Sequence, residues 1–149
     1  MYRPPQTIDN KVIPNEDFFD LVDQLIKEGR KVVITPKGNS MMPFIRNGRD
    51  EVTLESLSRP AEVGDIILAR IGSNYVMHRV FAVDGDAITL MGDGNLSGKE
   101  YCGHADVIGI VTGISKDGGE PVPPVKGKLW RMLRPIRRFI LVVYRKVIL

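Results

Sequence analysis

The spacing of hydrophobic residues divides the chain into a short helical segment followed by a series of strands. Apolar residues recur at helical spacing from 18 to 26, after Asn15, which can cap a helix, and before Gly29, which can end one. The residues on this apolar face are Phe18, Leu21, Val22, Leu25 and Ile26. From Lys31 onward the pattern predicts mostly β-strands, and the turn-forming residues Gly, Asp, Asn and Pro separate one apolar run from the next. Strands are expected at 31–35, 50–55, 64–71, 75–83, 87–91 and 106–115. The pattern therefore predicts a mainly β domain with an N-terminal helix.

One predicted hairpin places two polar residues near each other. Asp84-Gly85 has the composition of a two-residue hairpin turn between 75–83 and 87–91. With this turn, His78 faces Met91 and Asp93 is its diagonal neighbour on the same face, about 7–8 Å away at the backbone. A three-residue turn would instead place His78 and Asp93 on opposite faces. Their proximity therefore depends on the register of the hairpin.

The C-terminal segment, residues 126–149, differs from the rest of the chain in its charge. Residues 126–149 hold eight Lys and Arg and no acid, which leaves 13 basic against 18 acidic groups in residues 1–125. On a helical wheel, one face of 129–149 is apolar and arginines gather on the other; Pro135 kinks or starts this helix. Its apolar face is formed by Leu129, Met132, Leu133, Ile136, Phe139, Ile140, Val143, Tyr144 and Val147.

Such an amphipathic helix suits an anionic membrane surface, with Trp130 at its edge. The alternative is a helix packed on the acidic body or on a second subunit. A nucleic-acid partner is not expected, because the positive charge is confined to an apolar helix without a recognisable binding module. Residues 121–124, rich in proline, predict a stiff spacer before this helix.

Composition limits the number of domains and the kinds of site that the chain can form. The chain has 149 residues and 43% hydrophobic content, which suits one domain with a substantial core. With one cysteine, Cys102, and two histidines, no internal disulfide, metal site or cofactor is expected. We see neither an export signal nor an apolar run of about 18 residues. The expected location is the cytoplasm, peripherally at the inner face of the membrane.

Three residues form a candidate catalytic group. Ser40 follows Gly38 and the 31–35 strand, and a nucleophilic serine needs such a turn to expose its hydroxyl and nearby amides. His78 would take the serine proton and Asp93 would orient the imidazole. Each residue also has a structural interpretation: Ser40 and Asp93 as turn formers, and His78 as a satisfied core histidine.

Several segments together resemble the catalytic domain of signal peptidase I. In order, they are Gly38-Asn39-Ser40-Met41-Met42-Pro43, Asn47-Gly48-Arg49-Asp50, Val63-Gly64-Asp65-Ile66-Ile67, His78-Arg79-Val80 and Gly92-Asp93-Gly94-Asn95. The resemblance covers roughly residues 31–115 and extends to the LexA-type repressors of the same superfamily. It implies a partly open β-barrel with the serine on a surface groove, and extended peptide substrates that bind as an added strand and are cleaved after small residues.

The resemblance also implies roles for individual residues. Most members place a lysine base where this chain has His78, and the histidine version is similar to the archaeal and endoplasmic-reticulum signal peptidases. Ser40 is then the nucleophile, His78 the base and Asp93 the orienting acid, with Glu100 as an alternative. The Ser40 backbone N–H, with help near Gly38, would form the oxyanion hole.

The implied organisation is an arm and helix over 1–30, a catalytic domain over 31–120, and a spacer with a basic amphipathic helix over 121–149. Signal peptidases usually carry an N-terminal transmembrane anchor, and here we expect the C-terminal helix to replace it. The predicted function is a serine endopeptidase that cleaves a leader or signal-like peptide at a membrane surface.

Two alternatives remain. A LexA-type self-cleaving regulator would need a DNA-binding domain and an Ala-Gly or Cys-Gly bond ahead of the serine, and only about 30 residues precede the core. A catalytically inactive relative would bind extended peptides without cleaving them.

Overall fold

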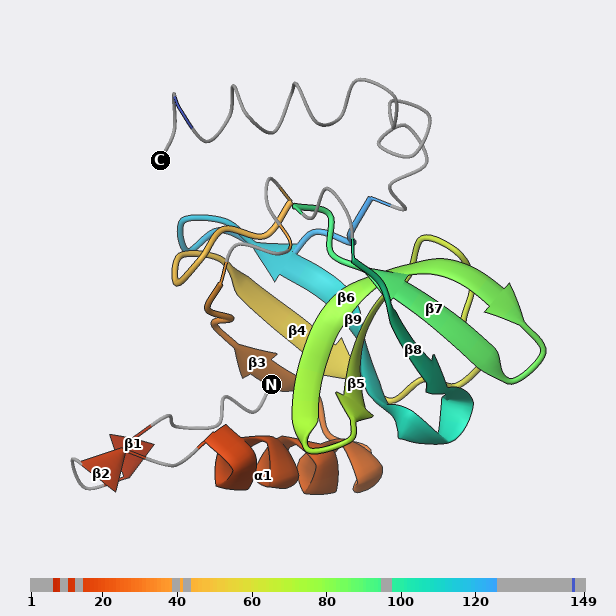
Figure 1. Ribbon diagram of the computed structural model, residues 1–149. Coiled ribbons are helices and arrows are strands. Elements are labelled where there is room, and N and C mark those ends of the chain that lie inside the picture. The colour runs from red at the N-terminus through yellow and green to blue at the C-terminus, as the bar shows by residue number, and fades with distance from the viewer. Residues whose placement is uncertain are drawn as a thin grey trace.

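The seven-stranded sheet is the main feature of the computed structural model, which describes residues 7–8, 11–12, 15–38, 41, 44–94, 98–125 and 146 (Figure 1). Its strands run antiparallel in the order β3-β4-β9-β5-β6-β7-β8 and form a curled half-barrel. The strands are β3 (Val32–Ile34), β4 (Glu51–Glu55), β5 (Ile66–Ile71), β6 (Asn74–Asp84), β7 (Ala87–Met91), β8 (Glu100–Gly103) and β9 (Val107–Ser115). The mainly β fold predicted for the domain is confirmed.

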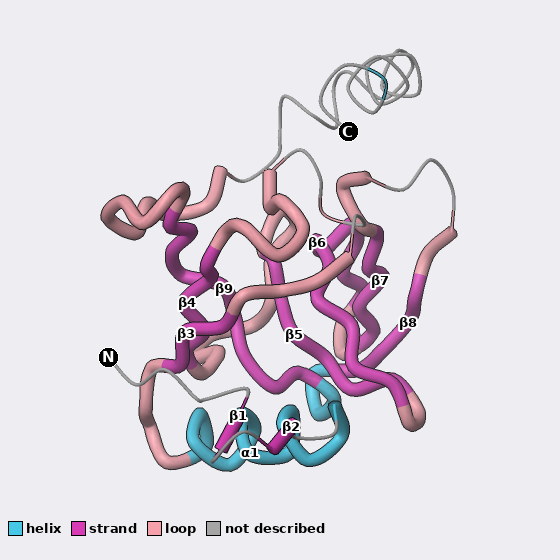
Figure 2. Tube along the Cα trace, turned by 90° about the vertical axis from the view of Figure 1, so that its left-hand side faces the viewer, coloured by secondary structure: helices cyan, strands magenta, loops and turns pink. Residues whose placement is uncertain are grey.

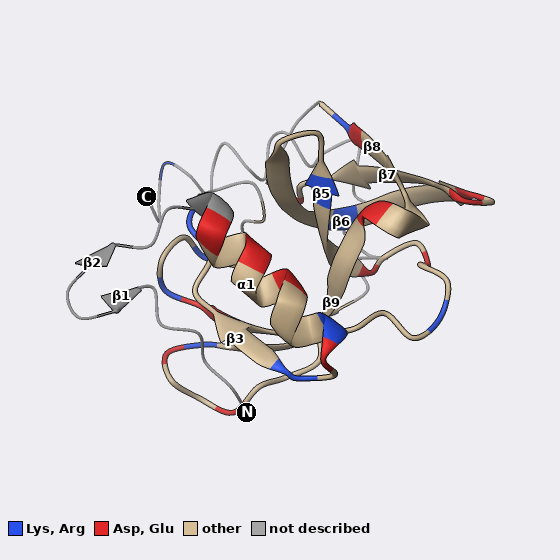
Figure 3. Ribbon diagram, turned by 90° about the horizontal axis from the view of Figure 1, so that it is seen from below, with Lys and Arg blue, Asp and Glu red and all other residues tan. Residues whose placement is uncertain are grey.

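The N-terminal helix forms where its apolar spacing predicts it. Helix α1 (Asn15–Lys27) lies across one end of the half-barrel, beside the strands (Figure 2). Gly29, with a φ of 82°, ends the helix, and its N–H donates to the Ile26 carbonyl. Acidic residues lie on the exposed surface of α1 (Figure 3), and one of the exposed acids of this helix, Asp20, accepts a hydrogen bond from the Tyr75 hydroxyl of β6.

The core lies on both faces of the curled sheet. In β5, Ile66 and Leu68 pack in a cluster with α1, whereas Ile67 and Ala69 pack in a second cluster on the other face. All four are at most 1% exposed. Both faces of this strand are buried because the sheet curls. The sequence of β5 therefore begins with consecutive apolar residues instead of alternating apolar and polar ones.

Two short features of the fold were not predicted from the sequence. Strands β1 (Thr7–Ile8) and β2 (Lys11–Val12) pair within the segment expected to be an irregular arm. Strand β8, with a following 3₁₀ turn at His104–Asp106, forms the far edge of the sheet. The hydrophobic pattern did not predict β8 because it has four residues and no alternation.

The predicted register of the β6–β7 hairpin was wrong. Asp84 pairs with Ala87, so the turn residues are Gly85 and Asp86, and a bulge interrupts β6 between Val80 and Ala82. Beyond the bulge, Arg79 lies opposite Met91. Since side chains alternate between the two faces, this shift by one residue places Arg79, rather than His78, on the face of Met91 and the residues that follow it.

The predicted C-terminal helix, 129–149, lies outside the described residues except for Lys146. Within the described part of the chain, no helix is long and apolar enough to cross a membrane. The 121–124 segment is not detached from the sheet at its start, because Val122 and Ile114 exchange two backbone hydrogen bonds.

Candidate functional site

His78 and Glu100 form an ion-pair geometry on one face of the sheet. The Nδ1 atom of His78 lies 3.0 Å from a carboxylate oxygen of Glu100. Glu100 begins β8 opposite Leu90 of β7, and Leu90 lies opposite Val80 of β6, two residues from His78. Opposed residues share a face, so Glu100 and His78 lie on the same side and the carboxylate reaches past β7 to the ring.

The contact with Glu100 favours one tautomer of the neutral His78 ring. Its side chain is 9% exposed, and that of Glu100 is 29% exposed. Because a carboxylate accepts hydrogen bonds, we assign the proton of the neutral ring to Nδ1, which leaves Nε2 as the proton acceptor. This is the tautomer that a general base needs.

Asp93 has a different partner. Its carboxylate accepts hydrogen bonds from Nε and Nη2 of Arg79 at 2.7–3.0 Å, and both side chains are nearly inaccessible to solvent. The Nη1 atom of Arg79 also donates to the carbonyls of Gly64 and Val125. The hairpin register explains this pairing, because Asp93 follows Met91 by two residues and therefore shares the face of Arg79.

The predicted nucleophile, Ser40, lies outside the described residues, but described residues before and after it in the chain are hydrogen-bonded to one another. The Gly38 N–H donates to Asn47 Oδ1 at 2.8 Å, and the Gly48 N–H donates to the Pro36 carbonyl at 2.9 Å. These two bonds close the loop that contains Ser40. The first bond engages the Gly38 N–H, which the resemblance implied as a help to the oxyanion hole; the Ser40 N–H remains the predicted donor.

A buried carboxylate supports the same loop. Asp50, which is 0% exposed, accepts hydrogen bonds from the Arg46 guanidinium and from Lys116. Burial alone would raise the pKa of Asp50, but hydrogen bonds from these two cations outweigh it and lower the pKa to about 2. Asp50 is therefore ionised at neutral pH and holds two positive charges beside the loop.

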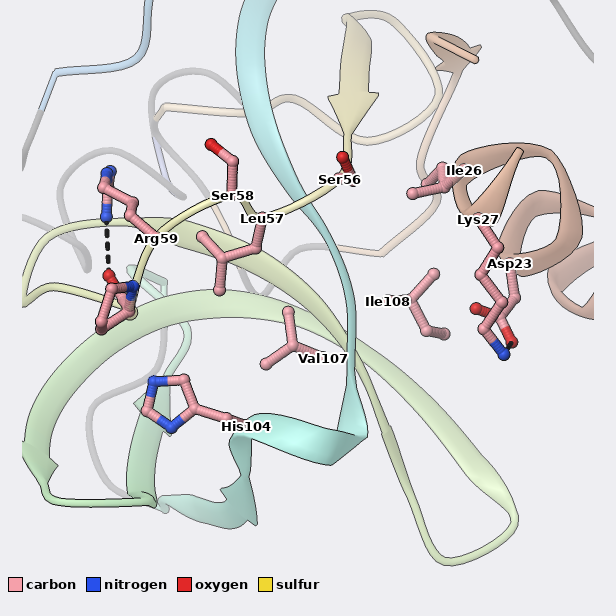
Figure 4. Close-up of a pocket in the computed structure, with 11 residues that line it drawn as sticks. Asp23, Ile26, Lys27, Ser56, Leu57, Ser58, Arg59, His104, Val107 and Ile108 are labelled. Carbon is pink, nitrogen blue, oxygen red and sulfur yellow. Dashed lines mark hydrogen bonds and ion pairs between the residues drawn. The ribbon is translucent and has the colours of Figure 1, made fainter. Parts of the chain in front are cut away.

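A pocket of about 540 Å³ lies elsewhere, between the end of α1, residues 56–60 and the start of β9 (Figure 4). It contains neither His78 nor Glu100. Two of its polar side chains already have partners: Arg59 binds Asp65, while His104 accepts from the Ala61 N–H and its Nδ1 lies 3.0 Å from the Asp86 carbonyl. We therefore place the candidate active site at His78 rather than in this pocket.

Two site residues could not be assigned with certainty from the sequence. Glu100 was noted only as an alternative to Asp93, because the short β8 gave no strand signal and the pairing of β7 with β8 is a long-range contact. Arg79 was visible next to His78 in the family-like segment, but its role depends on the register. Among the described residues, no group of three or more His, Cys, Asp or Glu is arranged to hold a metal ion.

The curled antiparallel half-barrel, which carries a His–Glu pair on one face, has the architecture of a β-rich peptidase domain. The chain belongs to the peptidase S24-like family, whose profile it matches over residues 4–112. This places it in the superfamily of the LexA-type repressors and signal peptidase I. No curated protein matches the sequence.

Proposed function

We propose that the protein is a serine endopeptidase in which Ser40 is the nucleophile, His78 the general base and Glu100 the carboxylate that orients His78. The observation that carries the proposal is the 3.0 Å contact between His78 Nδ1 and Glu100. A carboxylate in this position selects the tautomer that can accept a proton at Nε2 and stabilises the imidazolium formed by proton transfer.

The reaction follows from these roles. Ser40 Oγ forms a bond to the scissile carbonyl carbon while its proton passes to His78 Nε2, and the Ser40 N–H stabilises the oxyanion. The intermediate collapses with cleavage of the C–N bond, and His78 returns the proton to the departing amine. Water then attacks the acyl-enzyme, with His78 again accepting a proton, and releases the new carboxyl terminus and the free serine.

The substrate we propose is an extended leader or signal-like peptide, cleaved after a small residue such as alanine. Support comes from the resemblance of the serine and Gly-Asp segments to signal peptidase I and from the open edges of the half-barrel, to which a peptide strand can add. We further propose that the basic residues of 129–149 hold the protein at an anionic membrane surface.

A peptide library derived from a whole proteome tests this function. The wild-type chain is incubated with the library, and new termini are identified by mass spectrometry, in parallel with Ser40→Ala and His78→Ala. We expect cleavage after small residues by the wild type and loss of nearly all turnover in both variants. Cleavage that persists in Ser40→Ala would refute the assignment of the nucleophile.

The membrane proposal has a separate test. The full chain should sediment with vesicles that contain anionic phospholipid and remain in solution with vesicles of neutral phospholipid, because the attraction is electrostatic. Equal binding to both kinds of vesicle, or to neither, would contradict it.

The family match also supports a second candidate, a self-cleaving regulator of the LexA type. In that case, incubation of the purified chain at raised pH would give two fragments at a rate independent of protein concentration. A peptidase that acts on other proteins would leave the chain intact while it cleaves the library.

A further inference from the structure

We infer that Lys116 is a positioning residue for the reaction proposed above, because its ammonium ties the segment that follows Ser40 to the end of β9. The inference rests on the proposed function only for its catalytic consequence. The anchoring itself is a matter of contacts among described residues.

The segment after Ser40 turns back into the core immediately. Met41 is 4% exposed and Ile45 is 3% exposed, and both belong to the cluster that packs against α1. The Ile45 N–H donates to the Met41 carbonyl at 3.0 Å. Met41 directly follows Ser40 in the chain, so we infer that the contacts which hold Met41 and Ile45 in the core restrain the chain next to the serine.

Lys116 makes two bonds to this segment from outside it. Its Nζ donates to the Phe44 carbonyl at 2.8 Å and to the Asp50 carboxylate at 2.7 Å. Lys116 directly follows β9, which lies between β4 and β5 in the sheet. One ammonium thus connects both ends of the 44–50 segment to the end of β9.

Arg46 cannot replace this connection. It binds Asp50 through its side chain and its backbone N–H, but it belongs to the same segment and therefore stiffens that segment only locally. Its bond to Asp117 is at the exposed surface, where ion pairs contribute little. Asp50 directly precedes β4, and Lys116 is a cation outside the segment that bonds both to Asp50 and to the Phe44 carbonyl at the other end of it.

Phe44 extends the connection towards the proposed base. Its ring lies under the guanidinium of Arg79, with the guanidinium carbon 5.1 Å from the ring centroid. Arg79 is the neighbour of His78 on β6. Phe44 is therefore held at its carbonyl by Lys116 and at its ring by Arg79, so that a displacement of Lys116 changes the position of the serine segment relative to β6.

The experiment compares Lys116→Met with Lys116→Arg and with the control Lys31→Met, which removes an exposed ion pair to Glu55. Arg46 continues to bind the buried Asp50 when Lys116 is replaced, so Lys116→Met should still fold. For Lys116→Met we expect kcat to fall about 10- to 100-fold, with KM within about twofold of wild type, because a misplaced nucleophile slows chemistry more than binding. Lys116→Arg should recover part of the loss, and the pH dependence of kcat/KM should be unchanged because His78 and Glu100 are untouched.

Amide hydrogen exchange by NMR gives a second readout that needs no substrate. The amides of Ile45 and Gly48 should exchange faster in Lys116→Met than in wild type and Lys31→Met. Unchanged exchange, or faster exchange with unchanged kcat, would overturn the positioning role. Faster exchange in a protein whose wild type cleaves nothing would instead refute the proposed function and leave the anchoring in place.

Discussion

Substitution of the two carboxylates near β6 should separate stability from activity. Asp93→Asn and Glu100→Gln each remove one negative charge without changing the size of the side chain. The first carboxylate is bound to Arg79 and the second to His78, on opposite faces of the same strand. Asp93→Asn should therefore mainly lower stability, whereas Glu100→Gln should mainly lower activity.

The magnitudes follow from burial. The side chains of Arg79 and Asp93 are 4% and 3% exposed, and loss of one member of a buried ion pair leaves an uncompensated charge, at a cost of about 3–5 kcal/mol. Glu100 is 29% exposed, and its loss should change the free energy of unfolding by less than about 1 kcal/mol. If Glu100 orients the base, its loss should lower kcat by about 10²- to 10⁴-fold.

Urea unfolding followed by far-UV circular dichroism measures the first effect, and turnover of a library-derived peptide measures the second. Asp93→Asn should be the destabilised variant, and its folded fraction should retain a larger share of activity than Glu100→Gln. The reasoning is refuted if Glu100→Gln retains full kcat, or if Asp93→Asn is as stable as the wild type.

Three further predictions concern residues around the site and the core. For Asp50, whose pKa is lowered to about 2 from an ordinary value of 3.8, about 2 kcal/mol of stability should be present above pH 4 and be lost as the pH falls towards 2. Urea unfolding at several pH values should show this slope in wild type, and an equal slope in Asp50→Asn would contradict it. Gly109→Ala should cost about 1–3 kcal/mol, because a Cβ there would lie 2.8 Å from the Glu55 carbonyl oxygen; an unchanged thermal midpoint would contradict this clash. Burial, with Asp106 and Asp86 nearby, raises the pKa of the Cys102 thiol, so its reaction with a disulfide reagent at pH 8 should be slower than that of a free thiol and should accelerate in urea.

The elements with a strong local signal were predictable. Helix α1 and strands β4, β6, β7 and β9 combine a clear apolar pattern with Gly, Asn or Asp at their ends, and the structure places them within a few residues of the expected bounds. The resemblance to signal peptidase I, carried by short segments in a fixed order, was sufficient to predict a mainly β half-barrel. Apolar spacing, turn residues and short motifs each depend only on residues close together in the chain, so they can be recognised in a single sequence.

The partner of His78 could not be deduced in the same way. Asp84-Gly85 and Gly85-Asp86 both satisfy the preferences of a two-residue turn, and nothing local reveals the bulge in β6. Either two-residue turn, without a bulge, would leave Asp93 on the face of His78; it is the extra residue of the bulge that moves Asp93 to the face of Arg79. The contact between His78 and Glu100 depends in addition on β8, which is too short to show a periodic pattern.

The contact between Arg79 and Val125 has a practical consequence for shortening the protein. Arg79 Nη1 donates to the Val125 carbonyl at 2.6 Å, and Val122 pairs with Ile114 of β9. A chain cut after residue 120 would lose both attachments and remove an acceptor from a guanidinium next to the proposed base. A chain that ends at 125 would keep them, and is the shorter form in which crystallisation and enzyme assays should start.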